Sequence, residues 1–327
     1  MKKPLLEVHD LKVHYPVKQG INLSSNKEYV KAVDGVSFSI NKGDALGLVG
    51  ESGCGKTTIG HTIVNLVKPT RGEILYEGKR IINVDKRRQK KLAYDIQIIF
   101  QDPYSSLDPR FTVRRCIEEP LVIHNVGDSA SRKEKVSQLM RDVGLNEEQM
   151  TKYPHEFSGG QRQRIGVARA LALQPSLIVC DEPVSALDVS IQAQILNLMQ
   201  DLREKYNLTY LFISHNLSVV YHICDRIVVM YLGKVMEISG KEDLFNDPRH
   251  PYTQGLLDAI PVPNPDKKGV ESIIAGDVPS PRNPPSGCVF HTRCQYAQPI
   301  CREEMPLPTE IGQDHVVFCH FAKEGFK

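Results

Sequence analysis

The residues from Gly50 to Thr58 have the types and spacing of a phosphate-binding loop. They spell Gly-Glu-Ser-Gly-Cys-Gly-Lys-Thr-Thr, which fits the pattern G-x-x-x-x-G-K-[ST]. Glycines let the backbone aim its N–H groups at phosphate oxygens, a lysine adds a full positive charge, and a threonine hydroxyl can bind magnesium. The alternative is a glycine turn with a chance lysine. An apolar run before the loop and a helical run from Thr58 to Val67 favour a nucleoside triphosphate site. The candidate binding residues are Gly50, Ser52, Gly53, Cys54, Gly55, Lys56, Thr57 and Thr58.

An acidic pair, Asp181 and Glu182, directly follows the apolar run Leu177–Cys180. A carboxylate at the carboxyl end of a parallel strand can hold magnesium through water, and its neighbour can orient or deprotonate an attacking water. Taken alone, such a pair is more often a helix cap or a solvated turn. Because the chain also has a phosphate loop, we interpret Asp181 as a magnesium residue and Glu182 as the catalytic base.

A second glycine turn, Ser158-Gly159-Gly160, precedes a predicted helix with Ile165, Ala168 and Leu171 on one face. The serine and the free N–H groups of the glycines could bind an anion at the helix start. The alternative is an ordinary helix cap with a basic first turn. Its place shortly before the Asp181–Glu182 pair favours a nucleotide-related role.

The elements that position these residues alternate between strands and helices. Ala45–Val49, Leu177–Val179 and Leu211–Ser214 are short apolar runs of the kind found in buried parallel strands. Apolar residues with helical spacing predict two helices. The first helix precedes the strand Leu177–Val179 and ends near Gly144; its apolar residues are Val136, Leu139, Met140 and Val143. The second helix follows that strand, and its apolar residues are Ile191, Ile195, Leu198 and Leu202. The alternation predicts an α/β fold with a mostly parallel sheet, and the span 103–174 predicts an inserted helical subdomain.

Composition narrows the class of protein. The 41 Lys and Arg residues nearly balance the 39 Asp and Glu residues, for a net charge of +2, which argues against binding nucleic acid mainly by electrostatics. The most apolar stretch, residues 208–232, is interrupted by Ser214, His215 and Asp225 among others, so we expect no membrane-spanning segment. No signal-peptide pattern follows Met1, so we expect a cytosolic chain with reduced cysteines.

The last fifth of the chain is rich in proline and cysteine. We place a boundary near Ile260, between a domain that contains the motifs above (residues 1–260) and an extension (261–327). Four of the eight cysteines lie in the extension with the spacing C-x5-C-x6-C-x17-C; they are Cys288, Cys294, Cys301 and Cys319. Thiolates on one short segment can hold zinc or an iron–sulfur cluster, and the alternative is four unrelated thiols. Because a proline-rich segment buries little core of its own, we favour a metal site. The other four are interpreted as packing or loop residues: Cys54, Cys116, Cys180 and Cys224.

Taken together and in this order, the motifs over residues 5–260 resemble those of the ATPase subunit of an ABC transporter. Phe157–Gln161 matches the family's signature motif, Leu-Ser-Gly-Gly-Gln, with a conservative change at its first position. Ser185–Asp188 matches the loop between the two subunits, and His215 matches the switch histidine. Gln101 matches the glutamine that links nucleotide to the membrane subunits. Tyr15 fits the aromatic residue that stacks on adenine, although residues 17–31 form an insertion after it.

This resemblance implies a P-loop ABC-type domain with an antiparallel β subdomain and an inserted helical subdomain. Two such subunits pack head to tail, and the signature loop of one covers ATP held by the other. It implies that Lys56 and the loop amides hold the phosphates, that Thr57, Gln101 and Asp181 bind magnesium, and that Glu182 and His215 act in hydrolysis. The implied residues of the covering subunit are Ser158, Gly159, Gly160, Gln161 and Asp188.

Residues 241–320, with Pro248–Thr253 and the cysteine pattern, resemble the ATPases of bacterial oligopeptide and dipeptide permeases. This resemblance implies that the chain takes part in peptide import and has no nucleic-acid partner. It also implies a four-iron four-sulfur cluster at the four cysteines, with zinc as the alternative. It implies a second, related ATPase in a heterodimer, two integral membrane permease subunits that meet the loop Asp102–Arg110, and an external solute-binding protein. The expected location is the cytoplasmic face of the bacterial membrane, as a peripheral subunit.

Three other functions remain open at this point. A nickel-uptake ATPase belongs to the same subfamily and has the same motifs. A soluble ABC ATPase acting on DNA or ribosomes usually has two cassettes or a coiled-coil insertion, and the sequence shows neither. A regulatory cassette without catalysis is disfavoured by Lys56, Asp181, Glu182 and His215.

Overall fold

The computed structural model describes residues 3–17, 28–102, 104, 106–260, 274, 276–312 and 314–324. Part of the predicted insertion (18–27), the start of the predicted extension (261–273), and Pro103 and Ser105 lie outside these residues. The chain forms two compact units. The first contains Met1–Pro4, Ile40–Ala45 and Asn83–Ile213, and the second contains Leu5–Ser39, Leu46–Ile82 and Ser214–Lys327. Among the described helices, none is long and apolar enough to cross a membrane.

The first unit contains three parallel strands: β6 (Ile96–Ile99), β7 (Leu177–Asp181) and β8 (Thr209–Ser214). β7 pairs with β6 on one side and β8 on the other, from Leu177↔Thr209 to Asp181↔Ile213. All residues of β7 and β8 are buried, which explains why these strands are continuous apolar runs instead of alternating ones. The predicted parallel strands are confirmed, with β7 and β8 longer by two residues than their apolar cores.

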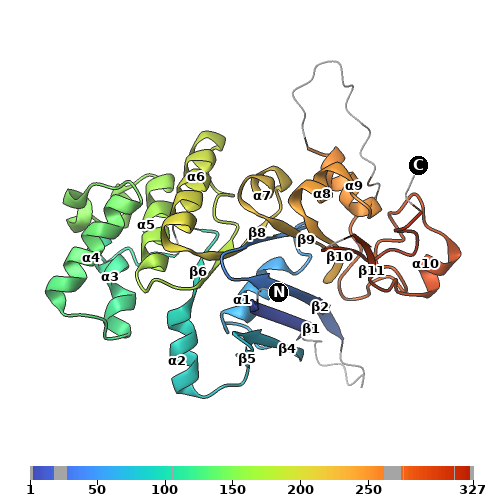
Figure 1. The fold of residues 1–327 in the computed structure, drawn as a ribbon, viewed down its shortest axis with the longest axis horizontal. Helices are drawn as coiled ribbons and strands as arrows, with labels where there is room; N and C mark the ends of the chain where they lie inside the picture. The colour runs from blue at the N-terminus through green and yellow to red at the C-terminus, as the bar shows by residue number, and fades with distance from the viewer. Residues whose placement is uncertain are drawn as a thin grey trace. The chain divides into compact units, whose positions relative to one another are not determined.

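Helices make up most of the rest of the first unit. They are α2 (Lys86–Asp95), α3 (Val113–Ile123), α4 (Ser129–Asp142), α5 (Gly159–Leu171) and α6 (Val189–Tyr206), with short 3₁₀ turns η1 (Glu147–Thr151) and η2 (Pro154–Glu156). Helices α3, α4 and α5 pack on one another, as Figure 1 shows. The predicted stripe on α4 is buried, and Gly144 after it has φ +72°, a left-handed conformation typical of a helix end. On α6 the prediction is partly wrong: Met199 is buried in place of Leu198, which is half-buried.

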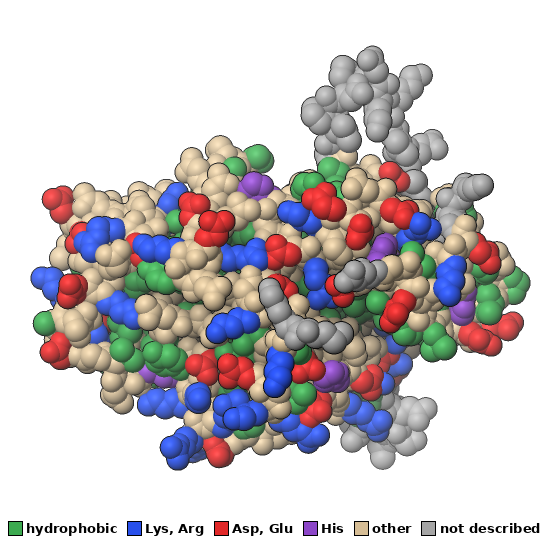
Figure 2. All heavy atoms as spheres, viewed as in Figure 1, with side chains coloured by type: hydrophobic (Ala, Val, Ile, Leu, Met, Phe, Trp, Pro, Cys, Tyr) green, Lys and Arg blue, Asp and Glu red, His purple; other side chains and the backbone are tan. Residues whose placement is uncertain are grey.

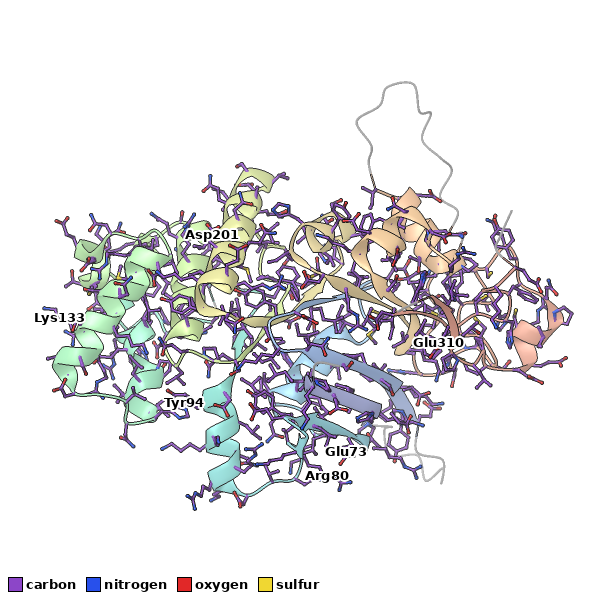
Figure 3. All side chains as sticks on the ribbon, in the orientation of Figure 1. Glu73, Arg80, Tyr94, Lys133, Asp201 and Glu310 are labelled. Atoms are coloured by element: carbon purple, nitrogen blue, oxygen red, sulfur yellow. The ribbon has the colours of Figure 1, made fainter. Side chains whose placement is uncertain are left out.

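An antiparallel sheet of four strands forms one part of the second unit, as the resemblance implied. Its strands are β1 (Pro4–Pro16), β2 (Tyr29–Asn41), β4 (Arg71–Tyr76) and β5 (Lys79–Arg80), in the order β2-β1-β4-β5. Burial alternates along β2, with one face of the strand inside and the other outside. Glu73 of β4 and Arg80 of β5 form an ion pair on neighbouring strands (Figure 3).

The other sheet of the second unit mixes parallel and antiparallel pairs. β3 (Ala45–Val49) is parallel to β9 (Arg226–Tyr231), and β9 is antiparallel to β10 (Lys234–Gly240). Two short strands after the predicted boundary continue this sheet: β12 (His315–Val317) pairs with β10, and β11 (Thr309–Gly312) pairs with β12. The helices are α1 (Lys56–Ile63), α7 (Leu217–Ile223), α8 (Lys241–Asn246), α9 (Pro251–Asp258) and α10 (Pro299–Glu303).

Charged side chains of both signs are intermixed on the face of the molecule that Figure 2 shows. This distribution agrees with the net charge of +2. The positive charge available to a phosphate ligand is therefore local: it is that of Lys56, at the end of the loop between β3 and α1.

Candidate nucleotide-binding site

The predicted phosphate loop connects β3 to α1, which begins at Lys56, two residues before the predicted start. The loop needs glycine at two points. Gly50 has φ +149° and Gly55 has φ +103°, and a Cβ on either would lie 2.1 Å from a backbone oxygen, of Met230 or Ala32 respectively. A side chain at either position would displace the main chain. These glycines therefore hold the loop backbone close against its neighbours, as the motif requires.

Hydrogen bonds from the Lys56 side chain connect the end of the loop to its first two residues. Its side chain is 4% exposed, and its Nζ donates hydrogen bonds to the carbonyl oxygens of Gly50 (2.7 Å) and Glu51 (2.9 Å). The ammonium group thus lies inside the ring of loop backbone. The N-cap Gly55 has no side chain to accept from the first helical N–H groups, which include those of Thr57 and Thr58. Backbone donors and one positive charge together make this loop suited to phosphate oxygens.

Cys54 is a packing residue of the loop. Burial raises the pKa of its thiol, and the nearby Lys56 only partly opposes that shift. A buried thiol with a raised pKa is a poor nucleophile. This agrees with the sequence interpretation of Cys54 as a structural residue.

Two more predicted residues of the second unit are accessible. Tyr15 lies on β1 and is 41% exposed. His215 lies in the exposed turn between β8 and α7. Exposure of these rings fits contact with a ligand, and their roles remain predictions.

In the first unit, the structure brings Gln101 and Glu182 together. Gln101 follows β6 and Glu182 follows β7, and the Gln101 Nε2 donates to the Glu182 Oε2 at 3.1 Å. Glu182 has φ +46°, and its N–H donates to the carbonyl of Ile213 at 3.0 Å. Asp181, the last residue of β7, is 3% exposed. The amide of Gln101 thus orients the predicted catalytic carboxylate, a contact that the sequence did not predict.

The signature segment forms the start of α5. The Ser158 hydroxyl accepts from the Gln161 N–H at 3.4 Å, and the Gln161 Oε1 accepts from the Ser158 N–H at 3.0 Å. The alternative of a helix cap is therefore correct as a local description. A Cβ on Gly160 would lie 2.6 Å from Ile191 Cγ2, and one on Gly159 would lie 3.3 Å from Leu187 Cδ2. The glycines thus let the start of α5 approach the segment around the start of α6.

The Asp188 side chain, at the N-cap of α6, makes no capping hydrogen bond and is exposed. Exposed residues at the starts of α5 and α6 fit a surface that meets a second subunit. Their predicted contact with nucleotide remains a prediction.

Two residues around the loop, Tyr252 and Arg293, were not predicted from the sequence. The Glu51 N–H donates to the hydroxyl of Tyr252 at 3.0 Å, and the Glu51 carboxylate accepts from Arg293 Nη1 at 2.8 Å. Tyr252 is in α9, and Arg293 lies between the predicted metal ligands Cys288 and Cys294. Glu51 itself gave a reason to expect a cation such as Arg293, because an unpaired carboxylate in an anion-binding loop is unfavourable.

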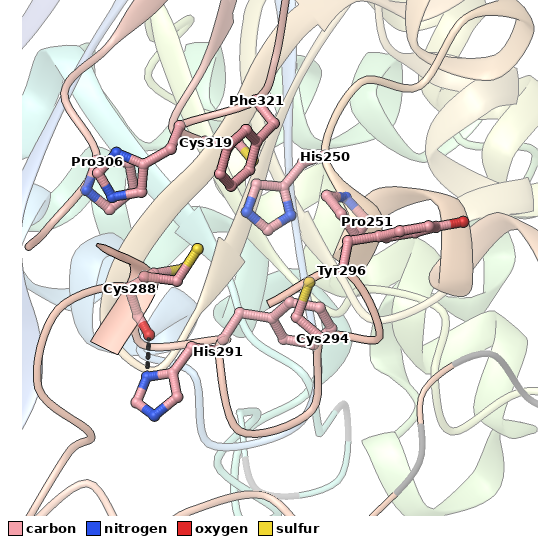
Figure 4. Close-up of a pocket in the computed structure, with 12 residues that line it drawn as sticks. His250, Pro251, Cys288, His291, Cys294, Tyr296, Pro306, Cys319 and Phe321 are labelled. Atoms are coloured by element: carbon pink, nitrogen blue, oxygen red, sulfur yellow. Dashed lines mark hydrogen bonds between the residues drawn. The ribbon is translucent and has the colours of Figure 1, made fainter. Parts of the chain in front are cut away.

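The four cysteines of the extension line one small cavity of about 20 Å³. Figure 4 shows the sulfurs of Cys288 and Cys294 near the His250 ring, and a hydrogen bond from His291 Nδ1 to the Cys288 carbonyl oxygen at 2.9 Å. Burial, with a smaller contribution from the neighbouring thiols, raises the pKa of Cys288 to about 11 and of Cys319 to about 12. In the described part of the chain, however, no three His, Cys, Asp or Glu side chains are arranged to bind a metal ion. The geometry therefore does not support the predicted metal site.

The segment Pro248–Thr253 is held by a buried carboxylate. Glu237 of β10 is 0% exposed and accepts from the N–H groups of Arg249 (2.8 Å) and His250 (3.0 Å) and from the His315 ring at 2.8 Å. Burial lowers the pKa of His250 to about 4, so its ring is neutral, and its Nδ1 accepts from the Tyr252 N–H. This network sets the position of Tyr252 against the phosphate loop.

The sequence matches two protein-family models and several proteins of known role. Residues 33–185 match the family model described as ABC transporter, and residues 236–301 match the model described as oligopeptide/dipeptide transporter, C-terminal region. The chain is 54% identical to the oligopeptide transport ATP-binding protein AppF of Bacillus subtilis, over 98% of both chains. It is 49% identical to the dipeptide transport ATP-binding protein DppF of Escherichia coli, over 95% of this chain and 93% of the other.

Solved structures show the same fold. The ATP-binding cassette MJ0796, a dimer bound to ADP and Pi, matches with a TM-score of 0.63 and 28% identity, over 72% of this chain and 98% of the other. The cbiO1 protein of Clostridium perfringens matches with a TM-score of 0.64 and 24% identity, over 75% and 92%. The predicted mixed α/β cassette with parallel and antiparallel sheets is confirmed.

Proposed function

Because this chain belongs to the family of ATP-binding proteins of oligopeptide and dipeptide ABC transporters, we propose that it hydrolyses ATP to power the import of peptides through a membrane permease. The observation that supports this most directly is the combination of a phosphate loop closed by Lys56 with a C-terminal region of the oligopeptide/dipeptide transporter type. The two relatives named above are ATP-binding proteins of oligopeptide and dipeptide transport.

ATP binding is assigned to the second unit. The amides of Gly53–Thr58 and the Lys56 ammonium hold the phosphates, and Tyr15 stacks on adenine. Binding also draws on a second subunit, whose Ser158–Gln161 segment and Asp188 cover the nucleotide. The dimeric state of MJ0796 with ADP and Pi supports this arrangement by analogy. Lys56→Ala removes the charge inside the loop and should abolish ATP binding.

Hydrolysis is assigned to Glu182, with Gln101 as its orienting partner. The hydrogen bond from Gln101 Nε2 orients the Glu182 carboxylate, which is the proposed acceptor of a proton from the attacking water. His215 senses the γ-phosphate. Thr57, Gln101 and Asp181 fit magnesium, since hydroxyl, amide and carboxylate oxygens are ligands that this ion accepts; it would neutralise charge on the phosphates.

Glu182→Gln keeps the size of this side chain and its place beside Gln101 but removes the base. General-base catalysis contributes about 10²–10⁴-fold, so turnover should fall by at least about 100-fold while ATP binding is retained. Glu204→Gln, at an exposed position of α6, is the matched control and should leave turnover unchanged. Robust hydrolysis by Glu182→Gln would show that another group activates water.

The proposed partners are a second, related ATPase, two integral membrane permease subunits and an external solute-binding protein, with this chain on the cytoplasmic face of the membrane. The loop Asp102–Arg110, directly after Gln101, is the proposed contact with the permeases. Affinity purification of the tagged chain from solubilised membranes should recover two polytopic proteins and a second ATPase. Recovery of this chain alone, or as a homodimer with the permeases, would contradict the proposed heterodimer.

Peptides and nickel are the two solutes to compare. A strain that lacks this chain should lose uptake of labelled di- and oligopeptides and regain it when the wild-type chain is supplied, but not with Glu182→Gln. Loss of nickel uptake with normal peptide uptake would favour the nickel alternative.

We also propose that Cys288, Cys294, Cys301 and Cys319 hold a four-iron four-sulfur cluster. The support is the donor set: four thiols line one cavity, and four thiolates are the ligands of such clusters, while the described residues are not prearranged to bind a metal ion. A bound cluster would link four points of the segment 288–319, in addition to the packing of its Phe290 side chain. Anaerobic purification followed by visible absorption and metal analysis is the test. A coloured protein with iron and sulfide is expected, and a colourless protein with stoichiometric zinc would favour the zinc alternative.

A further inference from the structure

Glu51 is held more firmly than its place in a surface loop requires. Its carbonyl oxygen accepts from Lys56, its N–H donates to the Tyr252 hydroxyl, and its carboxylate pairs with Arg293. The last two partners come from the C-terminal part of the chain, 201 and 242 residues away. The second residue of the phosphate loop is therefore positioned mainly by residues outside the loop.

A carboxylate at this point opposes the function of the loop. The loop uses backbone N–H groups and Lys56 to attract phosphate, and one negative charge in it repels the same ligand. The Arg293 guanidinium lies 2.8 Å from the Glu51 carboxylate, and the Arg293 side chain is only 8% exposed. Arg293 also donates to the Tyr231 hydroxyl at 3.4 Å, so a second contact directs it toward the loop. Arg293 thus neutralises the one acidic side chain among the loop residues.

The segment that supplies Arg293 is fixed by aromatic packing. The ring of Phe290 lies 5.3 Å from the rings of both Tyr231 and Tyr252, and Tyr231 and Tyr252 lie 4.8 Å apart. All three are at most 2% exposed. Phe290 is three residues before Arg293, so this packing determines where the guanidinium lies. The cysteine-bearing segment therefore contributes a charge to the nucleotide site.

We infer that Arg293 is a positioning residue for nucleotide binding: it neutralises Glu51 and thereby allows the phosphate loop to bind a triphosphate. The inference rests on the proposed function, because it assumes that the loop binds ATP. It makes the C-terminal extension part of the nucleotide site.

The test is a double-mutant cycle on the full-length chain, with the Kd for ATP and magnesium measured by calorimetry. Arg293→Gln leaves the Glu51 charge unpaired and should raise the Kd about tenfold, within the range of typical coupling between sites. Glu51→Gln alone removes both the repulsion and the need for a partner, and its Kd should stay within about threefold of wild type. In the double variant, Glu51→Gln should restore the affinity that Arg293→Gln loses. Arg302→Gln, at an exposed position of α10, is the control and should have no effect.

Rescue separates a charge effect from a structural one. If Arg293 only stabilised the fold, Glu51→Gln would not restore binding, and that result would overturn the inference. An unchanged Kd for Arg293→Gln would overturn it as well. If Arg293→Gln fails to fold, Arg293→Lys, which keeps the positive charge, is measured in its place. Its Kd for ATP should be near that of the wild type, and a tenfold higher Kd would contradict the role of charge neutralisation.

Failure of the proposed function looks different. If ATP does not bind to the wild-type chain, or binds equally well to Lys56→Ala, the proposed function is wrong. If the wild type binds ATP, Lys56→Ala does not, and Arg293→Gln equals the wild type, only the role of Arg293 is wrong.

Discussion

Glu237→Gln isolates the buried network that joins β10, β12 and the start of α9. The substitution keeps the shape of the side chain but replaces one acceptor oxygen with an NH₂ donor. In the better of its two orientations, the amide oxygen still accepts hydrogen bonds from the Arg249 N–H and the His315 ring. The NH₂ group then faces the His250 N–H, which loses its acceptor. A buried, unpaired N–H costs about 1–3 kcal/mol, and the remaining bonds lose the added strength of a charged acceptor. The expected loss of unfolding free energy is about 2–4 kcal/mol.

The assay is thermal unfolding followed by circular dichroism. A loss of this size corresponds to a fall in melting temperature of about 4–16 °C for a domain of 150–250 residues. The same substitution at Glu242, an exposed residue of α8 that accepts from the Tyr221 hydroxyl, is the matched control. Its effect should be below about 0.5 kcal/mol. Equal melting temperatures for Glu237→Gln and the wild type would refute the reasoning, because they would mean that the His250 N–H does not depend on this acceptor.

Two further predictions concern the phosphate loop and acid stability. Gly55→Ala should weaken ATP binding about tenfold more than Gly53→Ala, because both have positive φ but only Gly55 would place a Cβ against a backbone oxygen; equal losses in calorimetry would contradict this. Burial would raise the pKa of Asp34, but Lys234 and His14 lower it below its usual value. Its carboxylate therefore stabilises the fold above about pH 4 and loses that effect as the pH falls. The difference in melting temperature between wild type and Asp34→Asn should shrink from pH 7 toward pH 3, whereas a constant difference would argue against the ion pair.

Local patterns predicted the strands and the phosphate loop well. Ala45–Val49 forms β3 with the predicted bounds, and the stripe on α4 is buried, because a short run of apolar residues or a helical repeat contains its own signal. The same signal was weaker on α6. There Leu198 and Met199 are neighbours, and only packing against the rest of the unit decides that Met199 is the buried one.

Contacts between distant parts of the chain had no such signal. Gln101 and Glu182 are 81 residues apart, and Glu51 and Arg293 are 242 residues apart, so each sequence segment looks ordinary alone. β11 and β12 have four and three residues, too few for any periodicity, and nothing local predicts that they extend the sheet of β10. These contacts form because the surrounding elements bring the residues together.

The most direct test of the proposed function is ATP hydrolysis by the complete transporter in lipid vesicles, measured together with peptide uptake. With the wild-type chain, the external binding protein and peptide should stimulate hydrolysis, and peptide should accumulate in proportion to the ATP consumed. With Glu182→Gln, both hydrolysis and uptake should fall by at least about 100-fold while ATP remains bound. Peptide accumulation that continues with Glu182→Gln would contradict the proposal that this chain powers import.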